Sequence, residues 1–411
     1  MKENKFAFRG KGFVAIWVAF YVTALLIPQL KVLRGNSDFL AQYTSATVVL
    51  SGKGQDLYDF EAQKRVQRTI LDSLDSDVEF AGGLLLFSHP PFVAFLYVTV
   101  AWLSYIPAFL AWNLISGACL IAGVVKLVRF YQIKSPTDLE QIGLSCLIFM
   151  PVSAVLLQGQ STSVAFLCLV LAFVNLKRAS EFWGGLWLSL ALIKFQILPL
   201  LLLVLLFKKR AKALVGFLTG GLSLAAASLL TVGPAALLRY LSLLRDMPGW
   251  VDLYGVNPVG ANCLRGQVYL LFYNALPEMA LAVSLLLNGA LIVFALFCWK
   301  GNWNSESPVF DLKFGLTIVV GLLIAPQVNF HDLSFLLFPG VILFHVADRK
   351  VGHMPIRWIL FTVAFPLQIL SFMALPIVPI QLNVIGLIVL SAVFFEAIRL
   401  RENTLLGGKS V

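Results

Sequence analysis

The sequence predicts an all-α protein that crosses a membrane about twelve times. Of its 411 residues, 59% are hydrophobic and only 13% are charged, whereas soluble domains have roughly 45–50% apolar and about 25% charged residues. The apolar residues also fall into blocks, many of them near the ~20 residues that a helix needs to cross a bilayer. An ordinary water-soluble domain is therefore excluded, and we expect a single integral-membrane domain over residues 1–411.

Thirteen apolar segments follow one another along the chain. They lie at 12–30, 92–105, 107–130, 141–157, 161–177, 182–194, 195–207, 212–231, 278–298, 311–326, 333–347, 355–373 and 380–400. The first follows a basic N-terminus without a small-residue cleavage site, so it predicts an uncleaved span. Segment 92–105 lies between Pro90-Pro91 and Pro107 and has no charge at its far end, so we interpret it as a re-entrant or surface helix. The other segments predict about 12 crossings, with a range of 11–13.

The basic residues orient these crossings. With 92–105 left out, the clusters between spans all fall on the side of the N-terminus, as the positive-inside rule requires. They are Lys126, Arg129 and Lys134; Lys177 and Arg178; Lys208, Lys209, Arg210 and Lys212; Arg349, Lys350 and Arg357; and Arg399 and Arg401. Both termini are then expected in the cytoplasm. The net charge of +10 is explained as a cytoplasmic collar, and a nucleic-acid partner has no support because no basic stripe carries interleaved aromatics.

The sequence gives no sign of a cofactor or a metal. Its five cysteines form no CxxC pair, and no nucleotide-binding or zinc-protease motif occurs in a supporting context. The carboxylates expected on the outer side of the membrane are of the type that binds divalent cations, but nothing in their spacing requires such a site. These are Asp38, Asp56, Asp59, Asp252 and Asp332. We therefore predict neither a cofactor nor a metal.

Residues 182–207 form the least regular part of the pattern. Two short apolar runs, each anchored by a cytoplasmic basic cluster, meet at Lys194-Phe195-Gln196. Helices of this length reach roughly 20 Å and cannot arrive at the far surface. Lys194 and Gln196 are then expected at the tip of a pair of short helices, inside the membrane domain. A charge there is costly unless it faces a cavity or a partner, so it marks a candidate functional site.

Polar residues gather at the outer ends of the spans. Besides the basic collar the inner loops are unremarkable, whereas the outer ends carry Asp38, His89, Gln158, Gln160, Lys194, Gln196, Asn257, Asn262, Arg265, Gln267, Gln327, Asn329, His331 and Asp332. This distribution predicts a one-sided site that opens outward at the membrane surface. A transporter would place its polar groups near the midplane.

The first outer loop, 31–91, is expected to have its own helices. Residues after Asp38 have the mixed polarity of an interfacial helix, and a second helix is expected from Asp59 to about Leu74. A second outer loop covers 232–277. Asp38 has two compatible interpretations: an N-cap of the helix that follows, or a general base at the membrane rim that takes a proton from a sugar hydroxyl.

The other polar residues also have two interpretations each. Lys194 is a snorkelling anchor or a phosphate contact, with Arg265 as a second contact. Gln160 and Gln196 are hydrogen-bonding links between helices or sugar contacts. His331-Asp332 is a helix cap or part of a ligand site.

The order of these motifs resembles a known family. Gly35-Asn36-Ser37-Asp38-Phe39 with Tyr43, Gly54-x-x-x-Tyr58-Asp59, Pro90-Pro91, Gly159-Gln160, Lys194-x-Gln196 and Pro326-Gln-x-x-x-His331-Asp332 together are similar to the bacterial polyprenyl-phosphate-mannose-dependent mannosyltransferases of glycosyltransferase family 87. The resemblance covers roughly residues 12–400. It departs at His89, where the family usually has Tyr, and at Phe195, where Pro commonly follows the Lys.

The resemblance implies a GT-C-type fold and a site for each substrate. Asp38 corresponds to the acidic residue that serves as catalytic base, and our own hypothesis is a single inverting displacement. The resemblance also implies a donor in which a hexose, first of all mannose, is attached to a polyprenyl phosphate. The acceptor is then a glycan or lipid on the outer side of a bacterial inner membrane. Lys194 and Arg265 are expected on the phosphate, and Gln160, Gln196 and His331 on the sugar. His89 and Tyr43 complete the expected substrate contacts.

Two other functions remain open at this point. A transporter or flippase for a lipid-linked sugar would use the same polar cluster as a vestibule, although no internal repeat and no acidic residue in mid-span supports it. An O-antigen ligase or polymerase would share the lipid-phosphate donor, but it would depend on a large late outer loop, and here the longest outer loop is the first.

Overall fold

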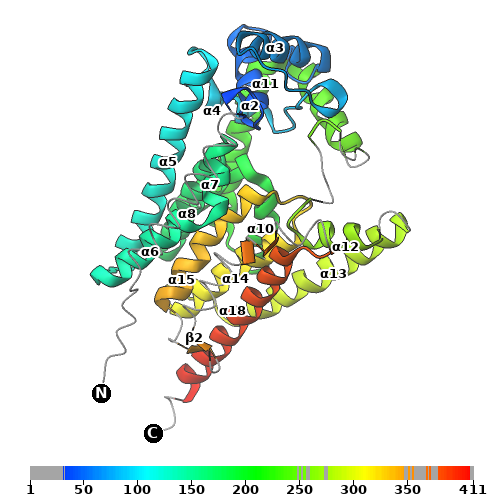
Figure 1. Ribbon diagram of the computed structural model, residues 1–411. Helices are drawn as coiled ribbons and strands as arrows, with labels where there is room; N and C mark the ends of the chain where they lie inside the picture. The colour runs from blue at the N-terminus through cyan, green and yellow to red at the C-terminus, as the bar shows by residue number, and fades with distance from the viewer. Residues whose placement is uncertain are drawn as a thin grey trace, which may run out of the picture.

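The computed structural model describes residues 31, 33–247, 250, 253–255, 260–272, 276–346, 350–351, 354–355, 367–368, 370–371 and 378–407. These residues are helical apart from turns, loops and one small hairpin, in which β1 (Lys350–Val351) pairs with β2 (Met354–Pro355). The helices form a long bundle with a cap of shorter helices at one end (Figure 1). The predicted span 12–30 and most of 355–373 lie outside the described residues, as do Asp252 and Asn257.

The first outer loop folds into the cap. It contains α2 (Phe39–Leu50), η1 (Gly54–Asp56), α3 (Phe60–Ser73) and η2 (Ala81–Gly83). α3 begins where the Asp59 side chain accepts a hydrogen bond from the Ala62 backbone N–H at 2.8 Å, a typical N-cap. α2 differs from the interfacial helix expected here: most of its side chains are buried, because it packs against α3 and α4.

Two buried glutamines of α3 fix the segment that leaves the cap. Gln63 donates to the Leu57 carbonyl at 2.7 Å and accepts from the Phe87 N–H at 3.0 Å. Gln67 both donates to and accepts from the backbone of Leu85. Each amide thus replaces the backbone partners that an irregular segment lacks, and it holds the chain that leads to His89.

The segment 92–105 does not form a crossing helix. α4 (Pro91–Val98) has eight residues, which at 1.5 Å per residue is about 12 Å and far less than a bilayer. α5 (Tyr105–Phe130) follows and has the length and hydropathy of a span. The next span is broken: α6 (Pro136–Ile148) and α7 (Met150–Leu157) meet at an angle of 51° at Phe149. α8 (Thr162–Lys177) then runs beside α5.

Residues 181–207 form a pair of short helices. α9 (Glu181–Leu190), η3 (Ala191–Ile197) and α10 (Leu198–Phe207) follow without a loop, and their combined length and hydropathy would suit one crossing. However, Glu181 at the start of α9 forms a salt bridge with Arg210 just after α10. The two ends of the segment therefore meet, and the chain reverses at Lys194, whose φ of −128° and ψ of 68° are not helical.

α11 (Ala211–Asp246) connects this pair to the cap. It lies against α9 through small residues, since Gly185 faces the Ala213 carbonyl and Gly216 faces the Phe182 carbonyl. Such close backbone approach is typical of helix pairs in membranes. α11 continues through a break at Gly233 until it meets η1 in the cap.

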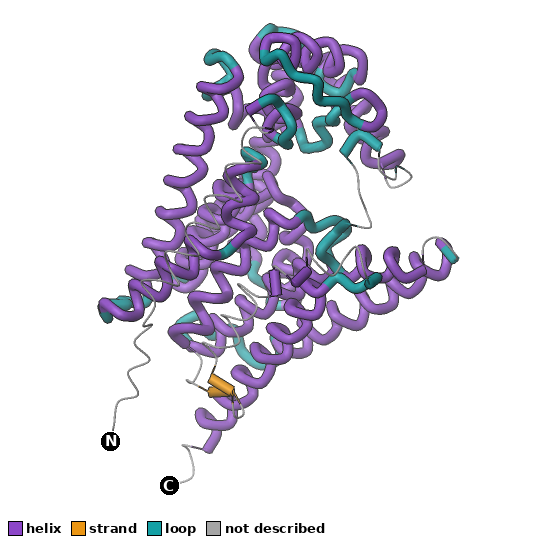
Figure 2. The backbone as a smooth tube through the Cα atoms, viewed as in Figure 1, coloured by secondary structure: helices purple, strands orange, loops and turns teal. Residues whose placement is uncertain are grey.

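The C-terminal half completes the bundle. It consists of α12 (Leu264–Phe272), α13 (Pro277–Cys298), α14 (Pro308–Ile324), η5 (Phe330–Leu336), α15 (Leu337–Val346) and α18 (Leu382–Gly407). α14 is buried along nearly its whole length and contacts α10, α13, α15 and α18. Figure 2 shows the loop that leads from α14 to η5 near the middle of the molecule.

By length and composition, the described residues include five helical segments that are apolar enough to cross a membrane, or six if the bent α6–α7 pair is one span. One of the five is Glu181–Phe207, which the reversal at Lys194 divides into two short helices. Large apolar side chains on α5, α11 and α13 are exposed, among them Leu114, Leu230 and Leu286. Exposed apolar surface on several long helices is expected where lipid replaces water. The protein is therefore a multi-pass membrane protein, while the count of twelve crossings stays a prediction.

Candidate functional site

Five polar side chains from four distant parts of the chain meet beside the cap. They are Asp38, Gln160, Lys194, His331 and Asp332, which we call the polar cluster. Asp38 precedes α2, Gln160 follows α7, Lys194 lies at the reversal in η3, and the last two lie in η5. The structure thus brings together four of the site residues that the sequence suggested, together with Asp332.

Hydrogen bonds join these side chains in a line. The Gln160 amide Nε2 donates to Asp38 Oδ2 at 2.5 Å, and the Lys194 ammonium donates to Gln160 Oε1 at 2.9 Å. Lys194 Nζ also lies 3.0 Å from Asp332 Oδ1 and 3.3 Å from His331 Nε2. Because Lys194 has only donors, its bond to Oε1 fixes which end of the amide faces Asp38.

Asp38 occupies the N-cap position of α2 but does not cap it. Its side chain makes no hydrogen bond to the described backbone of the helix, so this part of the sequence interpretation is wrong. Instead its own backbone N–H donates to Gln158 Oε1 at 2.9 Å. The carboxylate is left for the polar cluster, with Oδ2 held by Gln160.

The turn before Gln160 requires glycine. Gly159 has a φ of +58°, and a Cβ there would lie 2.7 Å from the Phe39 Cβ. Its carbonyl accepts a hydrogen bond from Tyr97 Oη at 2.9 Å. A left-handed residue with no side chain is needed at this position, and it lets Gln160 approach the start of α2.

Asp332 has two roles at once. Its Oδ2 accepts from the Asn329 N–H at 3.0 Å, as part of a capping box that begins η5. Its Oδ1 pairs with Lys194 and accepts from Thr162 Oγ at 3.3 Å. The sequence suggested a helix cap at this position, but it missed Asp332 as the partner of Lys194 and Thr162 as a further contact. The signal available was that a membrane lysine needs an acidic partner.

The cluster is buried except at one edge. The side chains of Lys194, His331 and Asp332 are only 3–6% exposed, whereas that of Asp38 is 35% exposed. Lys194 and Asp332 cancel each other's charge, so the remaining negative charge is that of Asp38. His331 Nδ1 lies 4.0 Å from Asp38 Oδ2. Its Nε2 lies 3.3 Å from Lys194 Nζ and 3.4 Å from Asp332 Oδ1, so the ring stands between the buried ion pair and Asp38.

His89 lies close to the polar cluster without bonding to it. Its backbone carbonyl accepts from Tyr58 Oη at 2.6 Å, and its Nε2 is buried with no hydrogen-bond partner in the described part of the chain. Burial is the main cause that lowers the pKa of His89 to about 3; the Lys194 charge lowers it further, and the Asp332 charge opposes it. The imidazole is therefore neutral at physiological pH.

Besides His89, three predicted site residues lie outside the cluster. Tyr43 donates to the Leu103 carbonyl at 2.7 Å and packs against the rings of Phe39 and Tyr105. Gln196 is half-buried and makes no hydrogen bond with the described residues. Arg265 of α12 lies over the Tyr269 ring, 4.8 Å from its centroid, and donates weakly to the Pro326 carbonyl at 3.4 Å. Its Nε is buried and unpaired in the described structure.

The arrangement leaves one carboxylate, that of Asp38, at the accessible edge of the cluster. Within the described ranges, no group of three or more His, Cys, Asp or Glu side chains is placed to hold a metal ion. The buried ammonium at the centre also repels a cation. The one accessible reactive group of the cluster is the Asp38 carboxylate.

Comparison with known proteins identifies the family. The model of glycosyltransferase family 87 matches residues 87–326, which is more than half of the chain and includes Gln160, Lys194 and Arg265. Asp38 and His331 lie outside the matched range. A comparison with curated proteins finds no match, and neither does one with solved structures. The match confirms the resemblance seen in the motifs and favours an enzyme over a transporter. The chain belongs to glycosyltransferase family 87 and is a membrane glycosyltransferase.

Proposed function

We propose that the protein transfers a hexose, in the first instance mannose, from a polyprenyl-phosphate donor to a glycan or lipid acceptor outside the cytoplasm. One observation carries this proposal. The polar cluster is buried and charge-paired except for Asp38, whose Oδ2 is held by Gln160 while Oδ1 makes no hydrogen bond with the described residues. A fixed carboxylate with one free oxygen at an accessible edge is suited to act as a general base.

The reaction needs only this base on the acceptor side. Asp38 takes the proton of the acceptor hydroxyl, the acceptor oxygen forms a bond to the anomeric carbon, and the bond from that carbon to the phosphate oxygen breaks. The polyprenyl phosphate leaves as an anion and needs no proton. Attack from the face opposite the phosphate inverts the anomeric configuration.

Lys194 is better suited to position Asp38 than to bind the phosphate. Its three ammonium hydrogens have three neighbours in the cluster, at 2.9–3.3 Å, so a phosphate contact would have to displace one of them. Arg265, unlike Lys194, has a hydrogen-bond donor that is not engaged, since its buried Nε has no partner in the described structure. We therefore assign the donor phosphate to Arg265, and the sugar to His331 and Gln160. We retain three further candidate substrate contacts, His89, Gln196 and Tyr43.

The site is proposed to face the outside of a bacterial inner membrane, with both termini in the cytoplasm. α8 supports this orientation because it begins at Thr162, beside Asp332, and ends at Lys177. Lys177 pairs with Asp311, near further basic residues that follow α8 and α10. The basic residues and the polar cluster are thus a helix length apart, and basic residues are enriched on the cytoplasmic side.

The test is transfer of labelled hexoses from synthetic polyprenyl-phosphate donors to an acceptor extract in detergent. Asp38→Asn should lower kcat by about 10²–10⁴-fold, the usual contribution of a general base, while unfolding stays close to wild type. Glu61→Gln, which changes an exposed carboxylate of the same loop, is the matched control and should keep full activity. Near-normal turnover by Asp38→Asn would refute the base, and no turnover by wild type with any lipid-linked hexose would refute the donor.

A further inference from the structure

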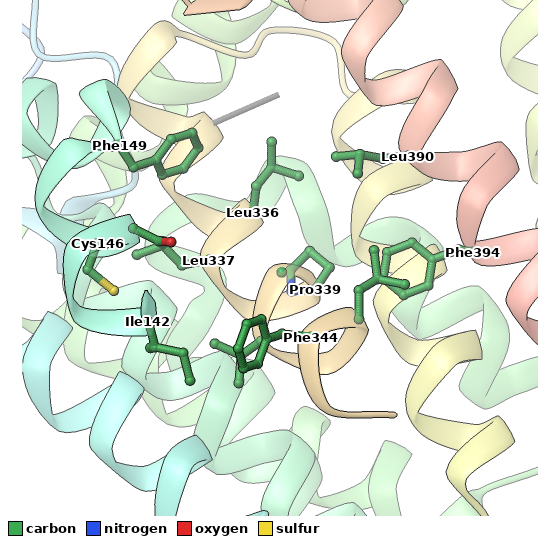
Figure 3. A pocket seen from close by; sticks show the side chains of 13 residues that line it. Ile142, Cys146, Phe149, Leu336, Leu337, Pro339, Phe344, Leu390 and Phe394 are labelled. Carbon is green, nitrogen blue, oxygen red and sulfur yellow. The ribbon is translucent and has the colours of Figure 1, made fainter. Parts of the chain in front are cut away.

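An apolar cavity lies between α6, α15 and α18 (Figure 3). Its volume is about 90 Å³, and its lining is carbon apart from the Ser145 hydroxyl, the Cys146 thiol and stretches of backbone. Residues that line it along its length include Ile142, Phe149, Leu336, Phe344, Leu390 and Phe394. An engineered cavity of ~150 Å³ with such a lining stays dry and binds benzene, so this one suits a branched group of about four or five carbons.

Two residues that line the cavity lie next to elements that carry the polar cluster. On one side Phe149 lies at the bend between α6 and α7, and the end of α7 is followed by Gln158 and Gln160. On the other side Leu336 is the last residue of η5, which contains His331 and Asp332. α7 and η5 pack against each other. The cavity therefore adjoins, along the chain, the two elements that also carry members of the polar cluster.

The spacing fits a prenyl chain attached to a phosphate. The eight residues of α7 span about 12 Å at 1.5 Å per residue. One isoprene unit has four backbone bonds and extends about 5 Å, so two or three units match the length of α7, which separates Phe149 from Gln160 along the chain. The methyl branch of the following unit then reaches the cavity.

We propose that this cavity binds the polyprenyl chain of the donor near its third isoprene unit, and so sets the position of the phosphate relative to Asp38. The inference rests on the proposed donor class and assigns it a second contact. A phospholipid acyl chain has the same apolar character, and the experiments below distinguish it from a prenyl chain.

Gly340 allows the cavity to be filled without a clash. It lines the cavity, and a Cβ added there meets no atom within 4 Å. Gly289 of α13 is a matched control, since a Cβ there also meets open space and α13 does not line the cavity. We expect Gly340→Leu to lower kcat/KM at least tenfold for a donor of eleven isoprene units, because overpacking excludes the chain. A donor of two units, which ends before the cavity, should lose less than twofold, and Gly289→Leu should change neither. Equal losses for both donors, or no loss for the long donor, would overturn the proposal.

Photolabelling tests binding without catalysis, so it separates this inference from the proposed function. The probe is a sugar-free polyprenyl phosphate with a photoreactive group on its third isoprene unit, added to the full chain in detergent. We expect crosslinks in α6, α15 or α18 that unlabelled polyprenyl phosphate suppresses and that Gly340→Leu weakens. Crosslinks confined to other segments would overturn the proposal. So would labelling of these helices that a diacyl phospholipid suppresses equally well, since that would make the cavity a general lipid site.

Discussion

Replacing Lys194 by Met should separate the two consequences of the buried ion pair, stability and catalysis. Lys194 Nζ lies 3.0 Å from Asp332 Oδ1, and both side chains are almost fully buried. Removing one partner leaves the other as an uncompensated charge, which typically costs about 3–5 kcal/mol. Methionine keeps most of the side-chain length, so packing changes little. The same change removes the donor that orients the Gln160 amide, and with it the fixed position of Asp38.

A second buried ion pair, at the far end of α8, offers a matched control. Lys177 Nζ pairs with Asp311 Oδ1 at 2.7 Å and is similarly buried, with both side chains under 10% exposed, but it lies outside the polar cluster. Lys177→Met should therefore lose a similar free energy of unfolding while folded enzyme keeps its kcat. Lys194→Met should lose stability and lower kcat at least tenfold. The double variant Lys194→Met with Asp332→Asn should recover part of the stability, because no charge is left unpaired, but not the activity.

The assay is denaturant unfolding in detergent together with kcat, measured at a temperature at which all variants are folded. Equal residual kcat in Lys194→Met and Lys177→Met would refute the positioning role of Lys194. A loss below about 1 kcal/mol in Lys194→Met, the range of a surface pair, would refute the buried ion pair itself. A double variant no more stable than the single variant would show that the loss comes from packing.

Two further predictions concern residues that support the cluster. The pKa of His89 is lowered to about 3, below the ~6.5 of an unfolded histidine. Its contribution to stability is therefore complete above pH 6.5 and is lost as the pH falls toward 3, by up to about 1.4 kcal/mol per pH unit. The free energy of unfolding, measured with denaturant at pH 7.5 and 5.0, should differ less between the two pH values in His89→Gln than in wild type, and an unchanged difference would contradict a buried neutral imidazole. Gly159→Ala adds a Cβ that meets Phe39, whereas Gly52→Ala, at a similar positive φ, meets no atom within 4 Å. Both variants should therefore bear the backbone strain of about 1 kcal/mol, but only Gly159→Ala should also lower kcat, and equal kcat in the two would show that the turn does not position Gln160.

Much of the site could be found from the sequence because lipid makes polar residues conspicuous. Lys194 stood out as a charge inside an apolar segment, and Gln160 and His331 stood at the outer ends of spans. These residues could be identified as candidates without knowing their spatial neighbours, because a polar side chain in a membrane is costly unless it has a partner or a function. Asp38 was selected by its motif, and its position at the start of a helix suggested a cap that the structure does not form.

The sequence could not predict which partners these residues choose. Asp332 was interpreted as a cap or a ligand, because its pairing with Lys194 depends on the reversal of η3 lying beside η5. α2 was expected at the membrane interface, because its mixed polarity is also that of a helix buried under a cap. Gln196 lies only two residues from Lys194, yet of the two side chains only that of Lys194 hydrogen-bonds within the polar cluster.

The partial exposure of Asp38 is consistent with the demands of repeated turnover. A base that keeps the proton of one acceptor cannot accept the next, so its carboxylate needs contact with water or with an exchanging acceptor. Full exposure would supply that contact but would leave the side chain free to rotate away from the acceptor. In this structure the buried Gln160 holds Oδ2, while the Asp38 side chain as a whole is 35% exposed. In the proposed mechanism the buried pair fixes the position of the base and the partial exposure of the base permits proton release, which is why we expect the Lys194–Asp332 pair to matter for kcat although neither residue touches the reacting atoms.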